Sequence, residues 1–159
     1  MVVPSPIPRG RRSGCAVGTD QCLPSPADGV WEPLRSGAMQ PETRYARLGR
    51  DRIAYQMMGN GPIELVLTPG SFGHSDLEWE DPDAARFYHR LSSFARVLRF
   101  DRRGSGASDP LPLTQLPPWE SYVEEIEAVM EAAEWQQAAI MGLYDAGPAA
   151  ALFAATKPE

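Results

Sequence analysis

Histidine and cysteine, the side chains that most often bind transition metals, are scarce in this sequence. The 159 residues contain two cysteines and two histidines. Cys15 and Cys22 share one early segment, and no other cysteine or histidine lies nearby to complete a metal shell, so we interpret them as free thiols. The only histidines are His74 and His89. The sequence therefore predicts neither a metal site nor a bound cofactor.

Long apolar runs and an excess of positive charge are also missing. No run of about eighteen apolar residues occurs, so no segment is expected to cross a membrane. The first residues lack the apolar stretch of a secretory signal, which favours a cytoplasmic location. The formal net charge is −6 and the sequence pI is about 5.0. Such a chain has no electrostatic reason to bind nucleic acid.

The first part of the chain differs in composition from the remainder. Residues 1–41 are dense in proline, glycine, serine and arginine and show no apolar periodicity. Such a segment buries too little apolar surface to offset the entropy lost on ordering. We expect residues 1–41 to be a disordered tail, although a translation start assigned too far upstream would look the same.

From Thr43 onward, short apolar runs alternate with amphipathic segments. Two runs flanking Gly49 predict a β-hairpin, and the Asp81-Pro82 pair predicts the start of a helix. The predicted strands span 43–48, 52–58, 63–68, 96–101 and 137–143, and the helices begin at Pro82 and at about Trp119, the latter ending near Trp135. This order predicts an α/β fold with a mostly parallel sheet, an antiparallel N-terminal hairpin and flanking helices.

Acidic side chains cluster at both helices. Those between Glu78 and Asp83 agree with the dipole at a helix start and need no ligand. In the second helix Val123, Ile126 and Val129 share one face. The glutamates at 120, 124, 125, 127, 131 and 134 fall mostly on the others. We interpret these glutamates as a solvated surface rather than as catalytic carboxylates.

The segment 137–153 combines a short apolar run, a turn of small residues and an alanine-rich run, which predicts a strand, a sharp turn and a helix. Small residues at Gly142, Ala146 and Gly147 would let the two backbones approach closely. The spacing matches the nucleophile elbow G-x-S-x-G, in which the central side chain is presented on a strained turn. Here the central position holds Tyr144.

Other interpretations of this turn were weighed. A phosphate-binding loop would need Lys and then Ser or Thr after the second glycine, but Pro148 and Ala149 follow Gly147. The dinucleotide fingerprint G-x-G-x-x-G is absent. A shift by one residue would make Asp145 the nucleophile, but it places Leu143 where a small residue is needed. An ordinary junction between a strand and a helix remains open.

Three separate segments together resemble the N-terminal half of an α/β-hydrolase. Residues 67–71 resemble the oxyanion loop, residues 100–109 the D-x-R-G-x-G-x-S segment, and residues 141–147 the elbow. The opening and ending of residues 42–159 look closer still to actinobacterial members that precede an adenylate or guanylate cyclase domain. The resemblance implies an incomplete α/β-hydrolase fold over residues 42–159. It also implies relatives that are ester hydrolases or cofactor-free perhydrolases.

The resemblance also assigns roles to individual residues. The backbone N–H groups of Ser71 and Asp145 would form the oxyanion hole. Tyr144 would occupy the nucleophile position, although a phenol with a pKa near 10 departs from an activated serine. Further residues expected to line the pocket are Gly70, Phe72 and His74.

The remaining members of a catalytic triad are not evident. In the family the order is Ser, then Asp or Glu, then His, and no histidine follows Tyr144. His74 could border the pocket as a base, whereas His89 falls in the middle of a helix. We therefore expect a degenerate, truncated hydrolase that is inactive alone. Two alternatives remain, a regulatory or ligand-binding module associated with a nucleotide cyclase and one chain of a split hydrolase.

The expected partners follow from these hypotheses. A small acyl or ester compound is the expected ligand, and no nucleic acid or membrane partner is expected. The strand 137–143 would form an open sheet edge, at which the chain could self-associate or bind a partner chain.

Overall fold

An antiparallel hairpin opens the part of the chain that the computed structural model describes, which comprises residues 40–112, 114 and 117–157. β1 (Arg44–Leu48) pairs with β2 (Asp51–Met58) across a turn in which Gly49 has a positive φ of 61°. The predicted hairpin is confirmed. The prediction of a disordered tail and that of free thiols at Cys15 and Cys22 lie outside the described residues, apart from the last two positions of the tail.

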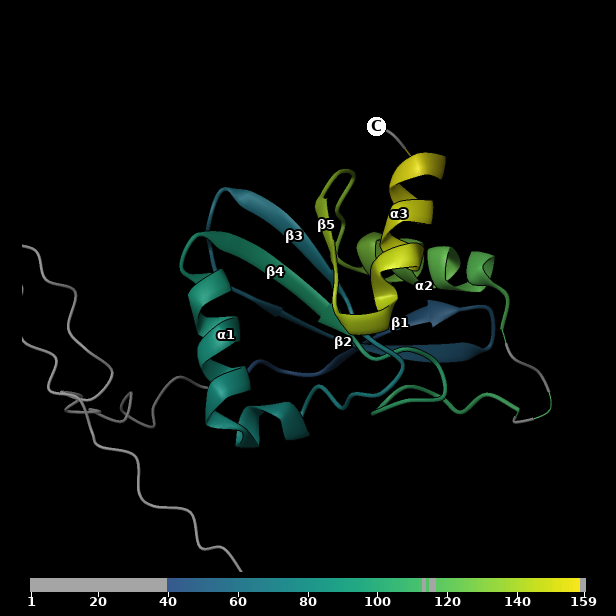
Figure 1. Ribbon diagram of the computed structural model, residues 1–159, viewed down its shortest axis with the longest axis horizontal. Helices are drawn as coiled ribbons and strands as arrows, with labels where there is room; N and C mark the ends of the chain where they lie inside the picture. The colour runs from purple at the N-terminus through teal and green to yellow at the C-terminus, as the bar shows by residue number, and fades with distance from the viewer. Residues whose placement is uncertain (1–39, 113, 115–116, 158–159) are drawn as a thin grey trace, which may run out of the picture. The chain divides into compact units, whose positions relative to one another are not determined.

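The hairpin continues into a five-stranded sheet (Figure 1). β3 (Ile63–Thr68), β4 (Ala95–Phe100) and β5 (Ala139–Gly142) complete the strand order β1-β2-β4-β3-β5. β4 runs antiparallel to β2 and parallel to β3, and β5 runs parallel to β3. The parallel part predicted from the sequence is therefore β4-β3-β5, and it follows the antiparallel hairpin as expected.

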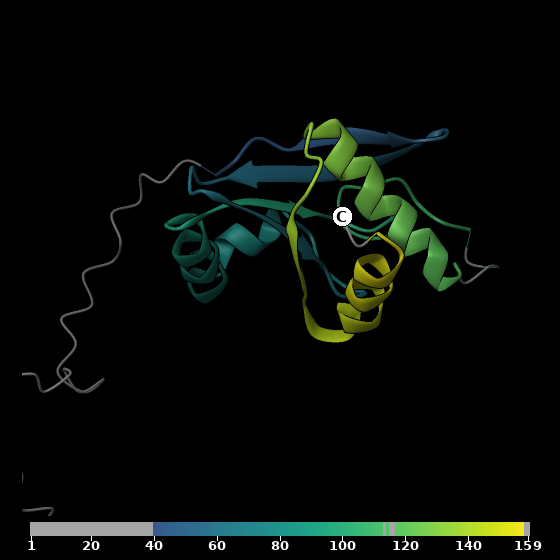
Figure 2. The same ribbon diagram turned by 90° about the horizontal axis from the view of Figure 1, so that it is seen from above.

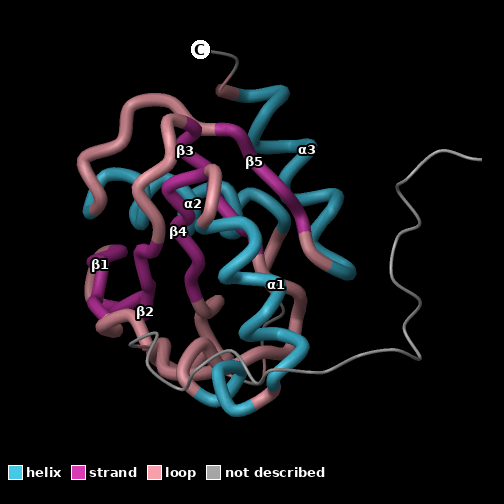
Figure 3. Tube along the Cα trace, turned by 90° about the vertical axis from the view of Figure 1, so that its left-hand side faces the viewer, coloured by secondary structure: helices cyan, strands magenta, loops and turns pink. Residues whose placement is uncertain are grey.

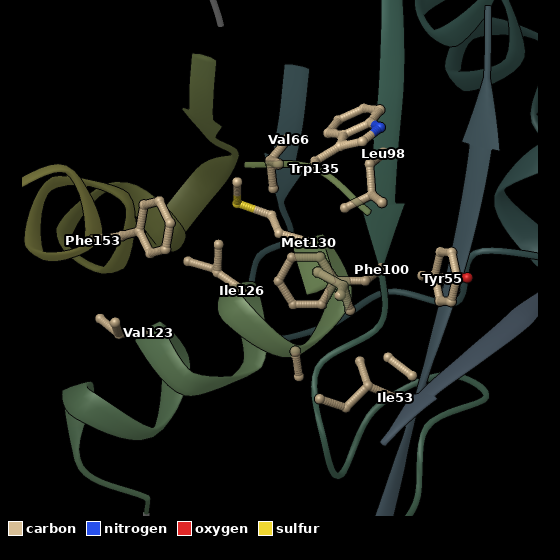
Figure 4. Close-up of a cluster of buried hydrophobic side chains, with 13 residues drawn as sticks. Ile53, Tyr55, Val66, Leu98, Phe100, Val123, Ile126, Met130, Trp135 and Phe153 are labelled. Carbon is tan, nitrogen blue, oxygen red and sulfur yellow. The ribbon is translucent and has the colours of Figure 1, made fainter. Parts of the chain in front are cut away.

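Helices cover both faces of the sheet. α1 (Pro82–Ser92) lies on one side, and α2 (Trp119–Ala132) and α3 (Gly147–Thr156) lie on the other (Figure 2). The larger core is formed under α2 and α3, where Ile126 and Phe153 pack against strand side chains such as Phe100 (Figure 4). This arrangement confirms the predicted class, a mixed α/β sheet with flanking helices.

The smaller core lies under α1, where Tyr88 packs with Leu67 and Val97. α1 begins where the sequence predicts. The side chain of Asp81 accepts a hydrogen bond from the N–H of Asp83 at 2.9 Å, and Pro82 occupies the first turn. A short 3₁₀ turn, η1 (Leu77–Glu80), precedes this cap. No helix in the described ranges combines the length and apolar character needed to span a bilayer.

The end of α2 differs from its prediction. The helix ends at Ala132 rather than near Trp135, and β5 begins at Ala139 rather than at residue 137. Glu134 has a positive φ of 59°, and the N–H of Trp135 bonds to the carbonyl of Met130 at 2.9 Å. A left-handed residue followed by such a backward bond closes a helix, which sequence periodicity alone does not reveal.

One glutamate of α2 also differs from its prediction. Glu125 is 1% exposed, and Arg103 donates a hydrogen bond from Nε to its Oε1 at 2.9 Å. The interpretation of the α2 glutamates as a solvated surface is therefore wrong at this position. The loop that follows β4 brings Arg103 over this part of the helix, and burial raises the pKa of Glu125.

Candidate functional site

The turn after β5 has the backbone of a strained elbow. The chain leaves β5, passes through the 3₁₀ turn η2 (Tyr144–Ala146) and enters α3 at once (Figure 3). Tyr144 has a positive φ of 53°, a conformation that non-glycine residues seldom adopt. Its side chain is 94% exposed. The elbow therefore presents the phenol outward, at the carboxyl ends of the parallel strands.

Close packing of the backbone explains only part of the small-residue pattern. A Cβ atom on Gly142 would lie 2.9 Å from backbone atoms of Ala146 and Gly147. Ala146 itself is completely buried. A Cβ atom on Gly147 would meet nothing within 4 Å. The predicted requirement for a small residue thus holds at Gly142 and is wrong at Gly147, because Gly147 opens α3 on its outer side.

The loop after β3 is bonded directly to the elbow. The N–H of Ser71 donates to Oδ1 of Asp145 at 2.9 Å, and the Ser71 hydroxyl donates to Oδ2 of the same carboxylate. These two bonds, the hydroxyl first, hold the pKa of Asp145 below its usual range, and the charge of Arg102 acts in the same direction. The Ser71 N–H group, which the resemblance assigns to an oxyanion hole, is therefore already hydrogen-bonded to the ionised carboxylate of Asp145.

Gly70 permits this contact between the loop and the elbow. A Cβ atom at Gly70 would lie 2.7 Å from Oδ1 of Asp145 and 3.3 Å from Cβ of Tyr144. A side chain at position 70 would thus force either the Asp145 carboxylate or the loop to shift. Gly70 therefore sets how closely Ser71 and Asp145 approach each other.

Neither histidine is bonded to the elbow. Nδ1 of His74 accepts a hydrogen bond from the N–H of Asp76 at 3.3 Å. The centre of the His89 ring, on α1, lies 5.5 Å from the centre of the Trp79 ring. Within the described ranges, no side chain hydrogen-bonds to the Tyr144 hydroxyl, and no group of three or more His, Cys, Asp or Glu is placed to hold a metal ion. The site as described contains no general base next to Tyr144.

A small cavity of about 20 Å³ lies beneath the elbow. Its lining includes Gly70, Phe72 and Tyr144, as expected from the sequence, but not His74. The lining residues are Leu67, Pro69, Gly70, Phe72, Glu78, Tyr88, Arg99, Phe100, Asp101, Leu143 and Tyr144. The volume is about that needed for one water molecule, so a ligand could place only one small group inside it.

Sequence reasoning missed a polar cluster on the floor of this cavity. Nη2 of Arg99 donates to Oε2 of Glu78 at 2.8 Å, and the hydroxyl of Tyr88 donates to the same oxygen. The guanidinium carbon of Arg99 lies 4.0 Å from the centre of the Tyr88 ring. Burial, as the largest cause, raises the pKa of Tyr88, which therefore stays a protonated donor. The available signal was that Arg99 alternates with Ala95 and Val97, which puts a charged residue on an apolar face of the strand 95–100.

Glu78 accordingly has a different role from the one expected. It lies in η1, before α1 begins. Its carboxylate accepts hydrogen bonds from Tyr88 and Arg99 and does not interact with the N-terminus of α1 as a helix-start charge would. The interpretation of the acidic residues around Asp81 as helix-start charges therefore holds for Asp83 but is wrong for Glu78. Strand β4 supplies the buried partner, which periodicity within residues 78–83 cannot show.

The segment that resembles D-x-R-G-x-G-x-S is a structural turn next to the site. Oδ1 of Asp101 accepts hydrogen bonds from the N–H and the hydroxyl of Ser75, at 2.9 and 2.6 Å, and Oδ2 accepts one from the N–H of Ala107 at 2.9 Å. A Cβ atom at Gly106, where φ is +54°, would lie 2.1 Å from Oδ2. Asp101 therefore ties together the two loops that surround the elbow.

The parallel strands, the elbow between β5 and α3, and the loop after β3 define an α/β-hydrolase fold that is present here in part. No family model matches the chain, and neither does any curated protein sequence. Solved structures do match it, and the likeness concerns the fold.

An α/β-hydrolase from Sphaerobacter thermophilus DSM 20745 is 27% identical, with a TM-score of 0.55 over 72% of this chain and 40% of that one. A hydrolase from Pseudomonas aeruginosa PA01 is 23% identical, with a TM-score of 0.62 over 74% of this chain and 42% of that one. A meta-cleavage product hydrolase from Pseudomonas fluorescens IP01 is 24% identical, with a TM-score of 0.61 over 76% and 42%. The chain thus spans about two fifths of the length of these proteins.

Proposed function

We propose that the described part of the chain is a noncatalytic module with an α/β-hydrolase fold, of the ester hydrolase or perhydrolase type, that binds a small acyl compound without hydrolysing it. The observation that carries this proposal is the bond between Ser71 and Asp145. An oxyanion hole acts by offering free N–H groups to the negative charge that develops in the transition state. Here that N–H group already binds a carboxylate, and a second negative charge would be repelled.

The chemistry of position 144 supports the same proposal. A phenol with a pKa near 10 is almost entirely protonated at neutral pH and needs a neighbouring base to act as a nucleophile. Tyr144 is exposed, and within the described residues its hydroxyl has no such neighbour. The elbow geometry is therefore present without the groups that would activate a nucleophile on it.

Hydrolysis of p-nitrophenyl acetate by the purified chain tests this proposal. We expect no product above the buffer rate from the wild-type chain, from Tyr144→Ser, which offers a small hydroxyl, or from Asp145→Ala, which frees the Ser71 N–H. A burst of p-nitrophenol that titrates with protein concentration and disappears in Tyr144→Phe would overturn the proposal.

The outer edge of β5 favours a second candidate, in which this chain is one part of a split hydrolase. Among the described strands only β3 pairs with β5, and the side chains of Ala139 and Met141 are exposed. An unpaired edge is a template for a strand from another chain. The matched solved chains also extend well beyond the span that they share with this chain.

Sedimentation velocity over a hundredfold range of concentration, compared for the wild-type chain and Met141→Lys, tests this second candidate. Charge on an exposed edge opposes strand pairing, so we expect association in the wild type that the variant loses. A wild-type chain that remains a soluble monomer throughout and unfolds cooperatively at a concentration-independent temperature of about 60 °C, typical of complete mesophile domains, would count against it. The association with a nucleotide cyclase remains a prediction, which co-purification with the product of a neighbouring cyclase gene would test.

A further inference from the structure

The buried side chain of Arg99 has one donor group without a partner. Arg99 projects from β4 with 6% of its side chain exposed. Nη2 binds Glu78, but Nη1 is buried and finds no hydrogen-bond acceptor among the described residues. Buried donors in folded proteins are almost always paired with protein or with ordered water. A partner for Nη1 should therefore lie in the space next to it.

The cavity beneath the elbow is the candidate for that space, because Arg99 lines it together with Gly70 and Leu143. Its volume of about 20 Å³ fits one water-sized group. Phe72 and Tyr144 also line it, and they are 92% and 94% exposed. These two rings therefore stand at the mouth, where the remainder of a ligand would meet apolar surface.

The charges around the cavity select the kind of group that can enter. Glu78 already balances the charge of Arg99, and Asp101 lines the same cavity. Asp145 adjoins the lining residue Gly70, because its Oδ1 is 2.7 Å from the position of a Cβ atom on that glycine. An incoming anion would meet these carboxylates, and Arg99 is the one cation among the described residues that line the cavity, so its entry is unfavourable. A neutral acceptor avoids that repulsion and still satisfies Nη1.

We propose that the cavity is a binding site for one neutral carbonyl oxygen, which accepts a hydrogen bond from Nη1 of Arg99. The guanidinium can only donate, so the group that enters must offer an acceptor, as a carbonyl oxygen does. Water occupies the position in the free protein, and a small neutral amide or ester displaces it. This inference deepens the proposed function, on which it rests, because it names the chemical class of the acyl ligand.

Acetamide and acetate provide the test, because they share a shape and differ in charge. Each compound is titrated into the full chain at constant ionic strength, and the ¹H–¹⁵N signals of the Arg99 side chain are followed by NMR. We expect acetamide to shift these signals in a saturable manner and acetate to bind about tenfold more weakly or worse. Equal or tighter binding of acetate, or signals that neither compound moves, would overturn the proposal.

Two variants assign any acetamide binding to Nη1. Arg99→Lys retains a cation for Glu78 but lacks the second N–H group of the guanidinium fork, so the chain should fold and lose acetamide binding, followed on backbone amide signals of the loop 70–73. Arg96→Met, the matched control, should keep the wild-type affinity within about threefold. It removes an arginine of the same strand whose side chain is 45% exposed and paired with Glu64, and which does not line the cavity. Undiminished binding by Arg99→Lys would contradict the site.

The proposed function and this inference fail separately. Turnover of p-nitrophenyl acetate would contradict the noncatalytic role, whatever the amide titration shows. A missing response to acetamide in a chain that hydrolyses nothing would contradict only the carbonyl site.

Discussion

Replacement of Arg103 by methionine should strongly destabilise the fold through Glu125. Arg103 donates from Nε to Glu125 at 2.9 Å and from Nη1 to Asp51 at 3.0 Å. Glu125 is 1% exposed and already has one carboxylate oxygen, Oε2, without a partner among the described residues. Removal of one member of a buried ion pair leaves the other charge uncompensated, which costs about 3–5 kcal/mol. We expect a loss of that size in the free energy of unfolding at pH 7.

The loss should depend on pH in a defined direction. Burial raises the pKa of Glu125 above its ordinary value of 4.5, and the variant lacks Arg103, which opposes this effect more strongly than the remaining cation Arg102. A carboxyl whose pKa is raised in the folded state binds more protons there than in the unfolded state. It therefore stabilises the fold below pH 4.5, and this contribution is lost as pH rises through the raised value. The destabilisation by Arg103→Met should thus shrink as pH falls from 7 towards 4.5.

Urea unfolding of the wild-type chain and Arg103→Met, followed by circular dichroism between pH 4.5 and 7.5, measures both effects. Lys157→Met is the matched control. Lys157 pairs with Glu127, which lies on α2 like Glu125, but the side chains of Lys157 and Glu127 are both about half exposed. Exposed pairs contribute about 0–1 kcal/mol, so the control should change little at any pH. A loss below about 1 kcal/mol for Arg103→Met at pH 7, or a loss that does not change with pH, would refute the argument.

Three further predictions concern the elbow, the core and the loops. Gly142→Ala should lower the thermal unfolding midpoint, because the added Cβ would lie 2.9 Å from backbone atoms. Gly147→Ala has open space around the added Cβ and should leave the midpoint unchanged or raise it. Equal effects of the two substitutions would contradict the packing argument. Ile126→Ala should cost about 2–5 kcal/mol in urea unfolding, because Ile126 is fully buried in the larger core, and a cost under about 1 kcal/mol would show that the core collapses around the cavity. Asp101→Asn should speed proteolytic cleavage within residues 102–109, because an amide cannot accept all three hydrogen bonds that Asp101 receives; unchanged cleavage would argue against its role in tying the loops.

Local patterns in the sequence determined the secondary structure and the position of the elbow. The hairpin and the strand Ile63–Thr68 follow from alternation and turn residues, and Asp81 and Pro82 mark the start of α1. The tight turn at Gly142 follows from its small neighbours. These features depend on residues a few positions apart, whose steric and hydrogen-bonding preferences act within one segment.

Only the tertiary structure decided which charges are buried and what occupies the site. The Ser71–Asp145 bond joins residues 74 positions apart, and the Arg99–Glu78 and Arg103–Glu125 pairs join different elements. A motif places Asp145 after Tyr144 but cannot show that its carboxylate folds back onto Ser71. Such contacts depend on how the loops after β3 and β4 meet the elbow and α2. Burial and pKa are properties of that packing and not of sequence spacing.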